Sequence, residues 1–379
     1  MNTVNSVLEM TMSDAILANI CCLQCIQPIE FARFIKISTL NGKRSFYLSL
    51  FLRTYKTSSS DDTFMNKYQA PKFKAAFLTP RYWGTLIIIS IMYSLSLLPF
   101  KLQLLLGRGI GRLAMRLMKK RQVTIKRNLE LCFPKMAEHE RAAILKDNID
   151  NTGIALFETA MAWFWSDKRV NKHVTIVGME HLEALEAQGK GALMLAVHSM
   201  NLELGARAFG IKKSGMGVYR PNNNPCFDYF QYKGRSRSNR TLIDRKNVKG
   251  MLEALNTGQR VWYAPDHDYG VRRSTFAPLF AVERACTTTG TSLLVDATDC
   301  AIVPFTMVRG EDGHYTLTLS APVDGFPKND PEQAAVFVNK IVEKSIMACP
   351  SQYMWLHRRF KTRPEGECCL YKPRLAPAI

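Results

Sequence analysis

The sequence predicts an α/β fold in which a layered sheet is flanked by helices and preceded by an N-terminal transmembrane helix. From residue 137 onward, short apolar runs alternate with helix-like segments, a pattern typical of α/β proteins. The run Ala-Leu-Met-Leu-Ala-Val at 192–197 has no polar position, as expected for a strand that is buried on both faces. The stretch 82–100 carries no charge over nineteen residues, which indicates the membrane helix.

The apolar and helix-like segments give an order of elements. Strands are expected at 174–178, 192–197, 216–219, 260–264, 301–307 and 314–320. Helices are expected over 137–165 and near 180–188, 201–209, 224–234, 246–257, 284–298 and 330–348. Because reactive groups gather beyond the carboxyl ends of strands in such sheets, the loops after these strands are the places to look for a site.

The stretch 82–100 begins with an aromatic pair, Tyr82-Trp83, and is otherwise mostly Leu, Ile and Ser. At about 1.5 Å per residue it just reaches across a hydrocarbon core of roughly 30 Å. A buried core helix is the alternative. Four Lys or Arg residues precede the stretch between 67 and 81, and seven follow it between 101 and 121. The positive-inside rule therefore puts the downstream part of the chain in the cytoplasm.

The chain divides into three parts on composition. Residues 1–64 are expected to be a poorly ordered extension, and residues 65–121 a membrane anchor followed by a basic interfacial helix. That helix is expected at 102–121, where Leu, Ile and Met alternate with Arg and Lys at steps of three and four, although a solvated helix face has the same spacing. Residues 122–379 would form a cytoplasmic domain.

The net charge of +19, from 51 Lys plus Arg against 32 Asp plus Glu, indicates anionic partners. Nucleic acid, anionic lipid, a phosphorylated glycolipid and an acidic protein all qualify. A basic nucleic-acid-binding protein is the serious alternative class. Against it, the charges fall around the expected membrane span and between buried strands, with no recognised nucleic-acid module. We therefore expect no nucleic-acid partner.

The most informative stretch is HSMNLE, which follows the apolar run at 192–197 and places His198 beyond the end of a strand. Glu203 lies five residues later, and on one regular helix the two side chains would point about 140° apart. They can meet only across a bend. If Ser199 or Asn201 caps a helix that begins near Leu202, its first turn would bring Glu203 back toward the imidazole. A carboxylate on one ring nitrogen fixes the tautomer and leaves the other nitrogen to accept a proton.

The chain resembles the late acyltransferases of lipid A biosynthesis from about Met65 to Glu365. The motifs that carry the resemblance, in the order that the family has them, are HSMNLE (198–203), GVYRPNNNP (217–225), KGRSRSNRTLIDRKNVKGM (233–251), VWYAPDHDYG (261–270) and QYMWLHRRFKTRPEG (352–366). In that family an acyl chain moves from acyl carrier protein to a hydroxyl on Kdo2-lipid IVA. The resemblance implies the layered α/β architecture of glycerolipid acyltransferases, and makes residues 122–379 an acyltransferase domain at the bacterial inner membrane.

The resemblance also implies roles for individual residues. His198 and Glu203 look like the base and its orienting carboxylate, while Arg235 and Asp266 match two further polar site residues. Arg235 could bind a phosphate or stabilise the oxyanion, and Asp266 could position that arginine or a sugar. Without the family, a surface arginine and a turn-capping aspartate would explain both positions. No G-x-S-x-G nucleophile elbow is present, in keeping with direct attack of the hydroxyl on a thioester.

Further basic side chains are candidates for binding the phosphates of the lipid A precursor or for docking acyl carrier protein, since arginine matches phosphate bidentately. These residues are Arg220, Arg237, Arg240, Arg245, Arg358 and Arg359. A solvated basic loop is the third possibility. No metal and no cofactor are expected, because thioester transfer needs neither and Asp266-His267-Asp268 lacks an accompanying ligand set.

The chain length of the acyl group is open. The APDHDYG motif at 264–270 is more similar to the lauroyl branch of the family than to the myristoyl branch, and palmitoleoyl relatives share much of the remaining sequence. A thioesterase or lipase is a third class of function, and it would show hydrolysis without acceptor lipid.

Overall fold

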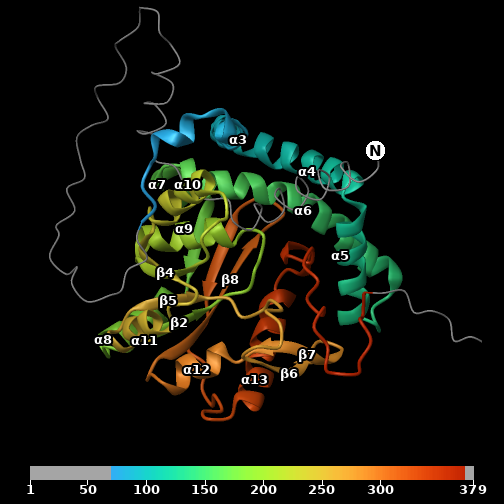
Figure 1. The fold of residues 1–379 in the computed structure, drawn as a ribbon, viewed down its shortest axis with the longest axis vertical. Helices are drawn as coiled ribbons and strands as arrows, with labels where there is room; N and C mark the ends of the chain where they lie inside the picture. Colours follow the sequence, from blue (N-terminus) through green and yellow to red (C-terminus); the bar gives the residue numbers. More distant parts are fainter. Residues whose placement is uncertain (1–69, 372–379) are drawn as a thin grey trace, which may run out of the picture.

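The computed structural model describes residues 70–371, so the expected extension at 1–64 lies outside the described residues. Figure 1 shows a twisted central sheet with helices on both faces, and a layer of helices (α3, α4 and α6) lying across one end of it. The predicted layered α/β fold is therefore confirmed for this part of the chain.

The central sheet has seven strands, and all neighbouring pairs run parallel except β8 and β9. In spatial order the strands are β1 (Val174–Val177), β9 (Tyr315–Leu319), β8 (Ala301–Arg309), β2 (Ala192–Leu195), β5 (Arg260–Tyr263), β3 (Gly215–Tyr219) and β4 (Asn239–Asp244). The apolar run of the sequence forms β2 at the centre, and each of its four residues is buried. A central strand covered on both faces needs such an uninterrupted run.

Helices cover the two faces of the sheet because parallel strands need long crossover connections. These helices are α7 (Asp167–His173), α8 (Met179–Ala187), α9 (Leu202–Lys212), α10 (Pro225–Arg235), α11 (Val248–Asn256), α12 (Gly290–Asp296) and α13 (Pro331–Met347). Leu193 and Leu195 of β2 pack into one core cluster with α11, α12 and α13. Met194 points to the opposite face and packs with α8 and α9. The side chains of β2 thus tie both helical layers to the sheet.

A second, smaller sheet lies beside α13 (Figure 1). It is the antiparallel pair β6 (Ser274–Leu279) and β7 (Val282–Thr288). The expected helix at 284–298 is wrong in its first part, because residues 282–288 form β7 and only 290–296 form α12. Thr287 and Thr288 are β-branched and favour the strand. The sequence prediction also missed β4, β6 and α7, whereas the other strands and helices expected after residue 137 are confirmed within a few residues.

The N-terminal helices differ from the expected membrane anchor. After the short helix η1 (Ala75–Leu78), α3 (Pro80–Ser96) stops before Leu97-Leu98-Pro99, and a new helix, α4 (Phe100–Leu117), begins. The expected 82–100 span is thus not one helix. Seventeen residues of α3 extend about 26 Å, less than a typical hydrocarbon core. Between residues 70 and 371, no helix combines the length and the apolar character that a membrane span requires.

Two further helices complete this layer: α5 (Lys119–Cys132) and α6 (Glu138–Phe164), the latter close to the helix expected at 137–165. Helices α4 and α6 approach each other through glycines. A Cβ added to Gly153 would lie 2.0 Å from the carbonyl oxygen of Gly107 and 2.3 Å from the amide nitrogen of Gly111. The two backbones are therefore in direct contact at this point, and any side chain would force them apart.

Candidate active site

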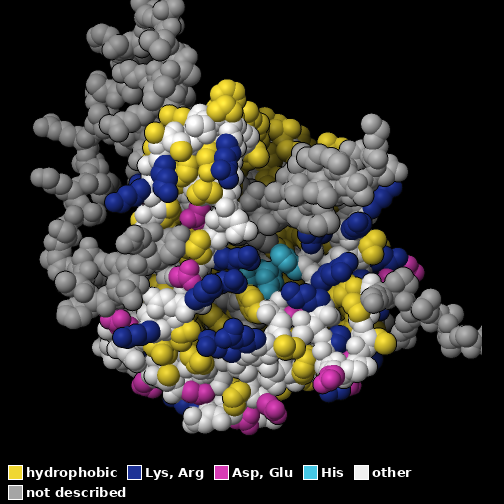
Figure 2. Space-filling view, in the orientation of Figure 1, with side chains coloured by type: hydrophobic (Ala, Val, Ile, Leu, Met, Phe, Trp, Pro, Cys, Tyr) yellow, Lys and Arg dark blue, Asp and Glu magenta, His cyan; other side chains and the backbone are white. Residues whose placement is uncertain are grey.

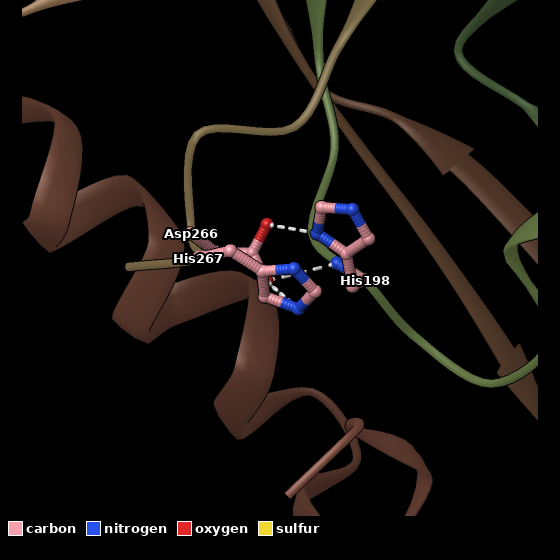
Figure 3. Close-up of side chains that lie close together, drawn as sticks. All are labelled: His198, Asp266 and His267. Carbon is pink, nitrogen blue, oxygen red and sulfur yellow. Dashed lines mark hydrogen bonds and ion pairs between the residues drawn. The ribbon is translucent and has the colours of Figure 1, made fainter. Parts of the chain in front are cut away.

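His198 and Asp266 meet at the carboxyl edge of the central sheet (Figure 3). Leu195, at the end of β2, pairs with Tyr263 at the end of the neighbouring strand β5. His198 lies three residues after Leu195, and Asp266 lies three residues after Tyr263. The two residues therefore occupy equivalent positions in neighbouring loops. The result is a 2.7 Å hydrogen bond between Nδ1 of His198 and Oδ1 of Asp266.

The Asp266 carboxylate is wholly buried and accepts three hydrogen bonds. They come from the ring of His198, from the backbone N–H of His198 at 3.1 Å, and from the hydroxyl of Tyr353 at 2.9 Å. Burial alone would raise the pKa of Asp266, but attraction to His198 outweighs it and holds the pKa far below its usual range. An ionised carboxylate can only accept, so Nδ1 of His198 carries the hydrogen, and in the neutral form of the ring Nε2 is the nitrogen that can accept a proton.

The partner of the imidazole is therefore Asp266, which corrects the expectation that Glu203 would hold it. Asn201 precedes α9 as expected, but its side chain bonds Gln352 at 2.8 Å and does not cap the helix. Glu203 lies in the first turn of α9, where Oε1 pairs with the guanidinium of Arg235 at 2.5 Å. The structure places the four predicted residues, His198, Glu203, Arg235 and Asp266, close together. It pairs His198 with Asp266 and Glu203 with Arg235, whereas the sequence predicted a pair of His198 and Glu203.

The Glu203–Arg235 pair lies close to the histidine. Burial raises the pKa of Glu203, while the positive charges of Arg235 and, to a smaller extent, His198 oppose that rise. Arg235 ends α10, and its guanidinium also lies over the ring of Tyr219, 5.7 Å from the centroid. A buried carboxylate is thus shared electrostatically between an arginine and the candidate base.

His267 and His357 extend the site, His267 by stacking on His198 and His357 by a tilted contact, 37° from parallel, with His267. The rings of His198 and His267 lie 3.6 Å apart with planes 11° from parallel, and His357 follows at 4.4 Å from His267. Burial and the neighbouring positive charge of His198 lower the pKa of His267 and of His357, that of His357 to about 4. Both therefore stay neutral near pH 7, and the stack adds no fixed positive charge beside the candidate base.

The segment from Pro350 to Thr362, here called the C-terminal clasp, lies far from His198 and Asp266 in the sequence but contacts both of their loops. Tyr353 forms a β-bridge with Ser199, the backbone N–H of Met354 bonds the carbonyl oxygen of His198, and Thr362 bonds Asp268 through both its N–H and its hydroxyl. These contacts fix the loop that carries His198 and the loop that carries Asp266 in one frame.

Basic side chains surround the histidines on this face of the molecule (Figure 2). Among the predicted binding residues, Arg220 follows β3, Arg245 follows β4 and Arg358 lies in the C-terminal clasp, and all three are exposed. The guanidinium of Arg358 lies 5.6 Å from the ring centroid of Tyr371. Exposed cations beside a partly exposed base, whose side chain is 24% accessible, suit an anionic substrate.

Two other predicted binding residues serve the fold. Arg237 donates to the carbonyl oxygens of Trp163 and Trp165 at the end of α6. Arg359 is 3% exposed and donates to the carbonyl oxygen of Cys286 at 2.8 Å. Arg359 is therefore held inside the fold, whereas Arg237 is only half-buried, and the binding role expected of both residues stays a prediction. Arg240 lies in β4, and its side chain falls outside the part of the structure that is described.

His198, Asp266 and His267 also have donor atoms close enough for a metal ion, all within 4.8 Å of one another. The rings of His198 and His267 lie in nearly parallel planes, so their in-plane lone pairs stay in two separate planes and are poorly placed to converge on one ion as the ligands of a tetrahedral ion would. A metal would also have to displace the hydrogen bond between His198 and Asp266. The arrangement suits proton transfer, and the expected lack of a metal stays a prediction.

Sequence reasoning missed Tyr353, His267 and His357 as members of the site. All three lie inside motifs that carry the family resemblance, at 261–270 and 352–366, but their contribution depends on contacts between the two motifs, which the sequence alone does not reveal. The pairing of His198 with Asp266 did have one, because the strands at 192–197 and 260–264 were both expected and each is followed by an acid or base. Neighbouring parallel strands would have brought those two residues to one edge.

Comparison with known proteins identifies the family of the chain. Residues 70–362 match the family described as bacterial lipid A biosynthesis acyltransferase. The chain is 51% identical to the lipid A biosynthesis lauroyltransferase of Escherichia coli K12 over 297 residues, which cover 78% of this chain and 97% of that protein. It is 44% identical to the palmitoleoyltransferase of the same strain (79% and 98% covered) and 28% identical to its myristoyltransferase (81% and 96% covered). The chain belongs to the bacterial lipid A biosynthesis acyltransferase family.

Proposed function

We propose that this protein transfers a fatty acyl group, in the first place lauroyl, from acyl carrier protein to the hydroxyl of a hydroxyacyl chain on Kdo2-lipid IVA. The observation that carries the proposal is the hydrogen bond between His198 and the buried, ionised Asp266, which prepares a base at the edge of the sheet. The greater identity to the lauroyltransferase than to the palmitoleoyltransferase or myristoyltransferase supports the choice of acyl group.

In the proposed reaction, Nε2 of His198 takes the proton of the acceptor hydroxyl as its oxygen attacks the thioester carbonyl. The carbon–oxygen bond forms, the carbon–sulfur bond then breaks, and the imidazolium returns the proton to the departing thiolate. No covalent acyl-enzyme is needed, because a thioester is already activated. Asp266 stabilises the imidazolium that forms between the two proton transfers, as buried carboxylates do beside catalytic histidines.

Arg235 would stabilise the negative charge that develops on the carbonyl oxygen, and Glu203 would hold Arg235 in place. A guanidinium beside the base suits an oxyanion or a lipid phosphate, and Glu203 fixes its position through the 2.5 Å ion pair. Arg220, Arg245 and Arg358 would meet phosphates of the lipid A precursor or the acidic surface of acyl carrier protein, since all three are exposed. No cofactor enters this scheme.

The protein would work at the cytoplasmic face of the bacterial inner membrane, where a lipid acceptor and a soluble carrier can both reach it. The outer faces of α3 and α4 support this location. They expose several large apolar side chains, and such patches are rare on proteins that contact only water. The accessible fractions of Ile87, Leu105 and Leu117 are 58%, 62% and 79%.

The test is to offer the purified protein a panel of acyl carrier protein thioesters with tetraacylated Kdo2-lipid IVA and to identify products by mass spectrometry. We expect one added lauroyl group, made at least tenfold faster than a palmitoleoyl or myristoyl product. His198→Ala should lower transfer by several orders of magnitude in a folded protein. Full activity of His198→Ala would reject the mechanism, and acyl hydrolysis without transfer would instead indicate a thioesterase.

A further inference from the structure

A groove away from the candidate active site opens between α4, α5 and α6, with a volume of about 440 Å³. The close contact of α4 and α6 explains it. The two backbones touch at Gly111 and Gly153, and the side chains of Met115, Leu145 and Ile149 line the groove next to this contact. A volume of this size can admit a small headgroup with the start of its chains.

The groove combines an apolar floor with a basic rim. Met115 is 1% exposed and forms the floor with Leu145 and Ile149, while Arg116 and Lys146 stand exposed at the edge. Within residues 70–371 neither cation of this edge pairs with a carboxylate. An uncompensated positive rim attracts an anion, and an apolar floor gives no advantage to a bare inorganic ion.

Arg112 adds a third positive charge to the lining, but Asp150 neutralises it. The guanidinium of Arg112 donates to both carboxylate oxygens of Asp150, at 2.7 and 2.6 Å. The bidentate ion pair of Arg112 and Asp150 is thus a polar part of the groove lining that carries no net charge. The net charge of the lining is therefore supplied by Arg116 and Lys146, which are the residues to test.

The surface next to the groove favours a membrane lipid over a soluble anion. Leu113 and Leu117 project from the same end of α4 and are 59% and 79% exposed. Helix α4 thus presents an apolar outer face beside a groove with a cationic edge. An anionic glycerophospholipid matches both, with its chains along the leucines and its phosphate between Arg116 and Lys146.

We propose that the α4–α5–α6 groove is a binding site for the headgroup of one anionic glycerophospholipid. Such a lipid would be neither donor nor acceptor of the acyl group. It would anchor α4 at a fixed rotation on the bilayer, since the groove and the apolar face of the helix would be occupied together. The proposal concerns lipid binding alone and does not depend on the acyl transfer proposed above.

The experiment uses the full chain in a neutral detergent and measures binding of dihexanoylphosphatidylglycerol by titration calorimetry, with dihexanoylphosphatidylcholine as the uncharged comparison. The test variant is Arg116→Gln with Lys146→Gln. The matched control is Arg108→Gln with Lys120→Gln, two exposed cations on α4 and α5 that do not line the groove. We expect the test variant to bind phosphatidylglycerol roughly tenfold more weakly, and the control to stay within about twofold of the wild type.

A third variant, Leu145→Gln, separates a lipid from a free anion. It should weaken phosphatidylglycerol binding, while any affinity for inorganic phosphate, measured in a separate titration, should stay the same. The melting temperature of the variant checks that it is folded. Equal losses in the test and control pairs would mean diffuse surface charge and overturn the proposal. Equal binding of the two lipids, or displacement of the lipid by phosphate at matching concentration, would overturn it as well.

Discussion

At the residue scale, the candidate base owes its properties to Asp266 and not to the glutamate that follows it in sequence. Three accepted hydrogen bonds and the attraction of His198 keep the carboxylate ionised, although its burial opposes the charge. The sequence could name His198, Glu203, Arg235 and Asp266 because the motifs resemble a known family. It could not assign partners, because a spacing of five residues leaves the direction of Glu203 to the bend between β2 and α9.

Asp266→Asn should lower the rate of acyl transfer by on the order of 10³–10⁴-fold, while substrate binding changes little. The amide can donate to Nδ1, which would favour the tautomer whose Nε2 carries the hydrogen and cannot accept a proton. Steady-state kinetics would measure it, with circular dichroism to check folding. Asp268→Asn is the control, since Asp268 accepts hydrogen bonds from Thr362 and, among the described residues, makes no hydrogen bond with the imidazole of His198. A rate loss as large for Asp268→Asn would point to collapse of the loop.

The lowered pKa of His357 makes a prediction about stability. In the unfolded chain this histidine takes up a proton near pH 6.5, whereas in the folded protein it does so only near pH 4. Between these values the unfolded state binds more protons, so the free energy of unfolding falls as the pH falls, by at most about 1.4 kcal/mol per pH unit for one group. His267 acts in the same direction.

We therefore expect His357→Gln to flatten the pH dependence of urea unfolding between pH 6.5 and 4. His139→Gln, at an exposed position on α6, should retain the wild-type slope. Asp266 does not confuse the comparison, because its stabilising charge is lost only as the pH falls below about 4. An unchanged slope in His357→Gln would show that the ring is not held neutral by the fold.

At the scale of elements, hydrophobic periodicity predicted most of the sheet but not the boundaries that depend on partners. The strand at 192–197 was readable because a central strand needs an uninterrupted apolar run. Strand β4 was not, since its sequence Asn-Arg-Thr-Leu-Ile-Asp has polar ends and lies at the edge of the sheet. The uncharged stretch 82–100 has the composition of one long helix, and only the structure reveals the break before Pro99.

Gly153→Ala should destabilise the protein by about 1–3 kcal/mol, because its Cβ would overlap the backbone of α4 and force the helices apart. Thermal or urea unfolding would measure the loss. The control is Gly109→Ala on α4, where an added Cβ meets nothing within 4 Å. That change should be neutral or stabilise the helix by up to about 1 kcal/mol. Similar losses in the two variants would mean that helix propensity, and not close packing, governs this region.

At the scale of the whole molecule, exposed apolar side chains concentrate on α3 and α4, at one end of the sheet, whereas α12 and α13 lie at the opposite end (Figure 1). This polarity could be expected from the basic and apolar spacing at 102–121. The manner of contact could not, because a span and a surface helix share the same composition. The structure ends α3 at Ser96 and packs α4 along α6.

Leu113→Gln with Leu117→Gln should reduce binding to vesicles of phosphatidylglycerol and phosphatidylcholine by about tenfold or more, because two exposed leucines lose their transfer into lipid. Cosedimentation would measure it. Leu293→Gln with Met347→Gln removes two exposed apolar side chains from α12 and α13 and should leave binding unchanged. If the second pair weakens binding as much as the first, the membrane-facing end has been misidentified.

The clasp formed by Pro350–Thr362 has a consequence for synthesis. A ribosome makes the loops of His198 and Asp266 long before it makes Tyr353, Met354 and Thr362, which hold those loops in register. A nascent polypeptide that has already formed its sheet would still lack the contacts that hold His198 and Asp266 together for proton transfer. Translation products that terminate before this segment should therefore be inert toward thioesters, so that incomplete chains do not consume the cell's activated fatty acids.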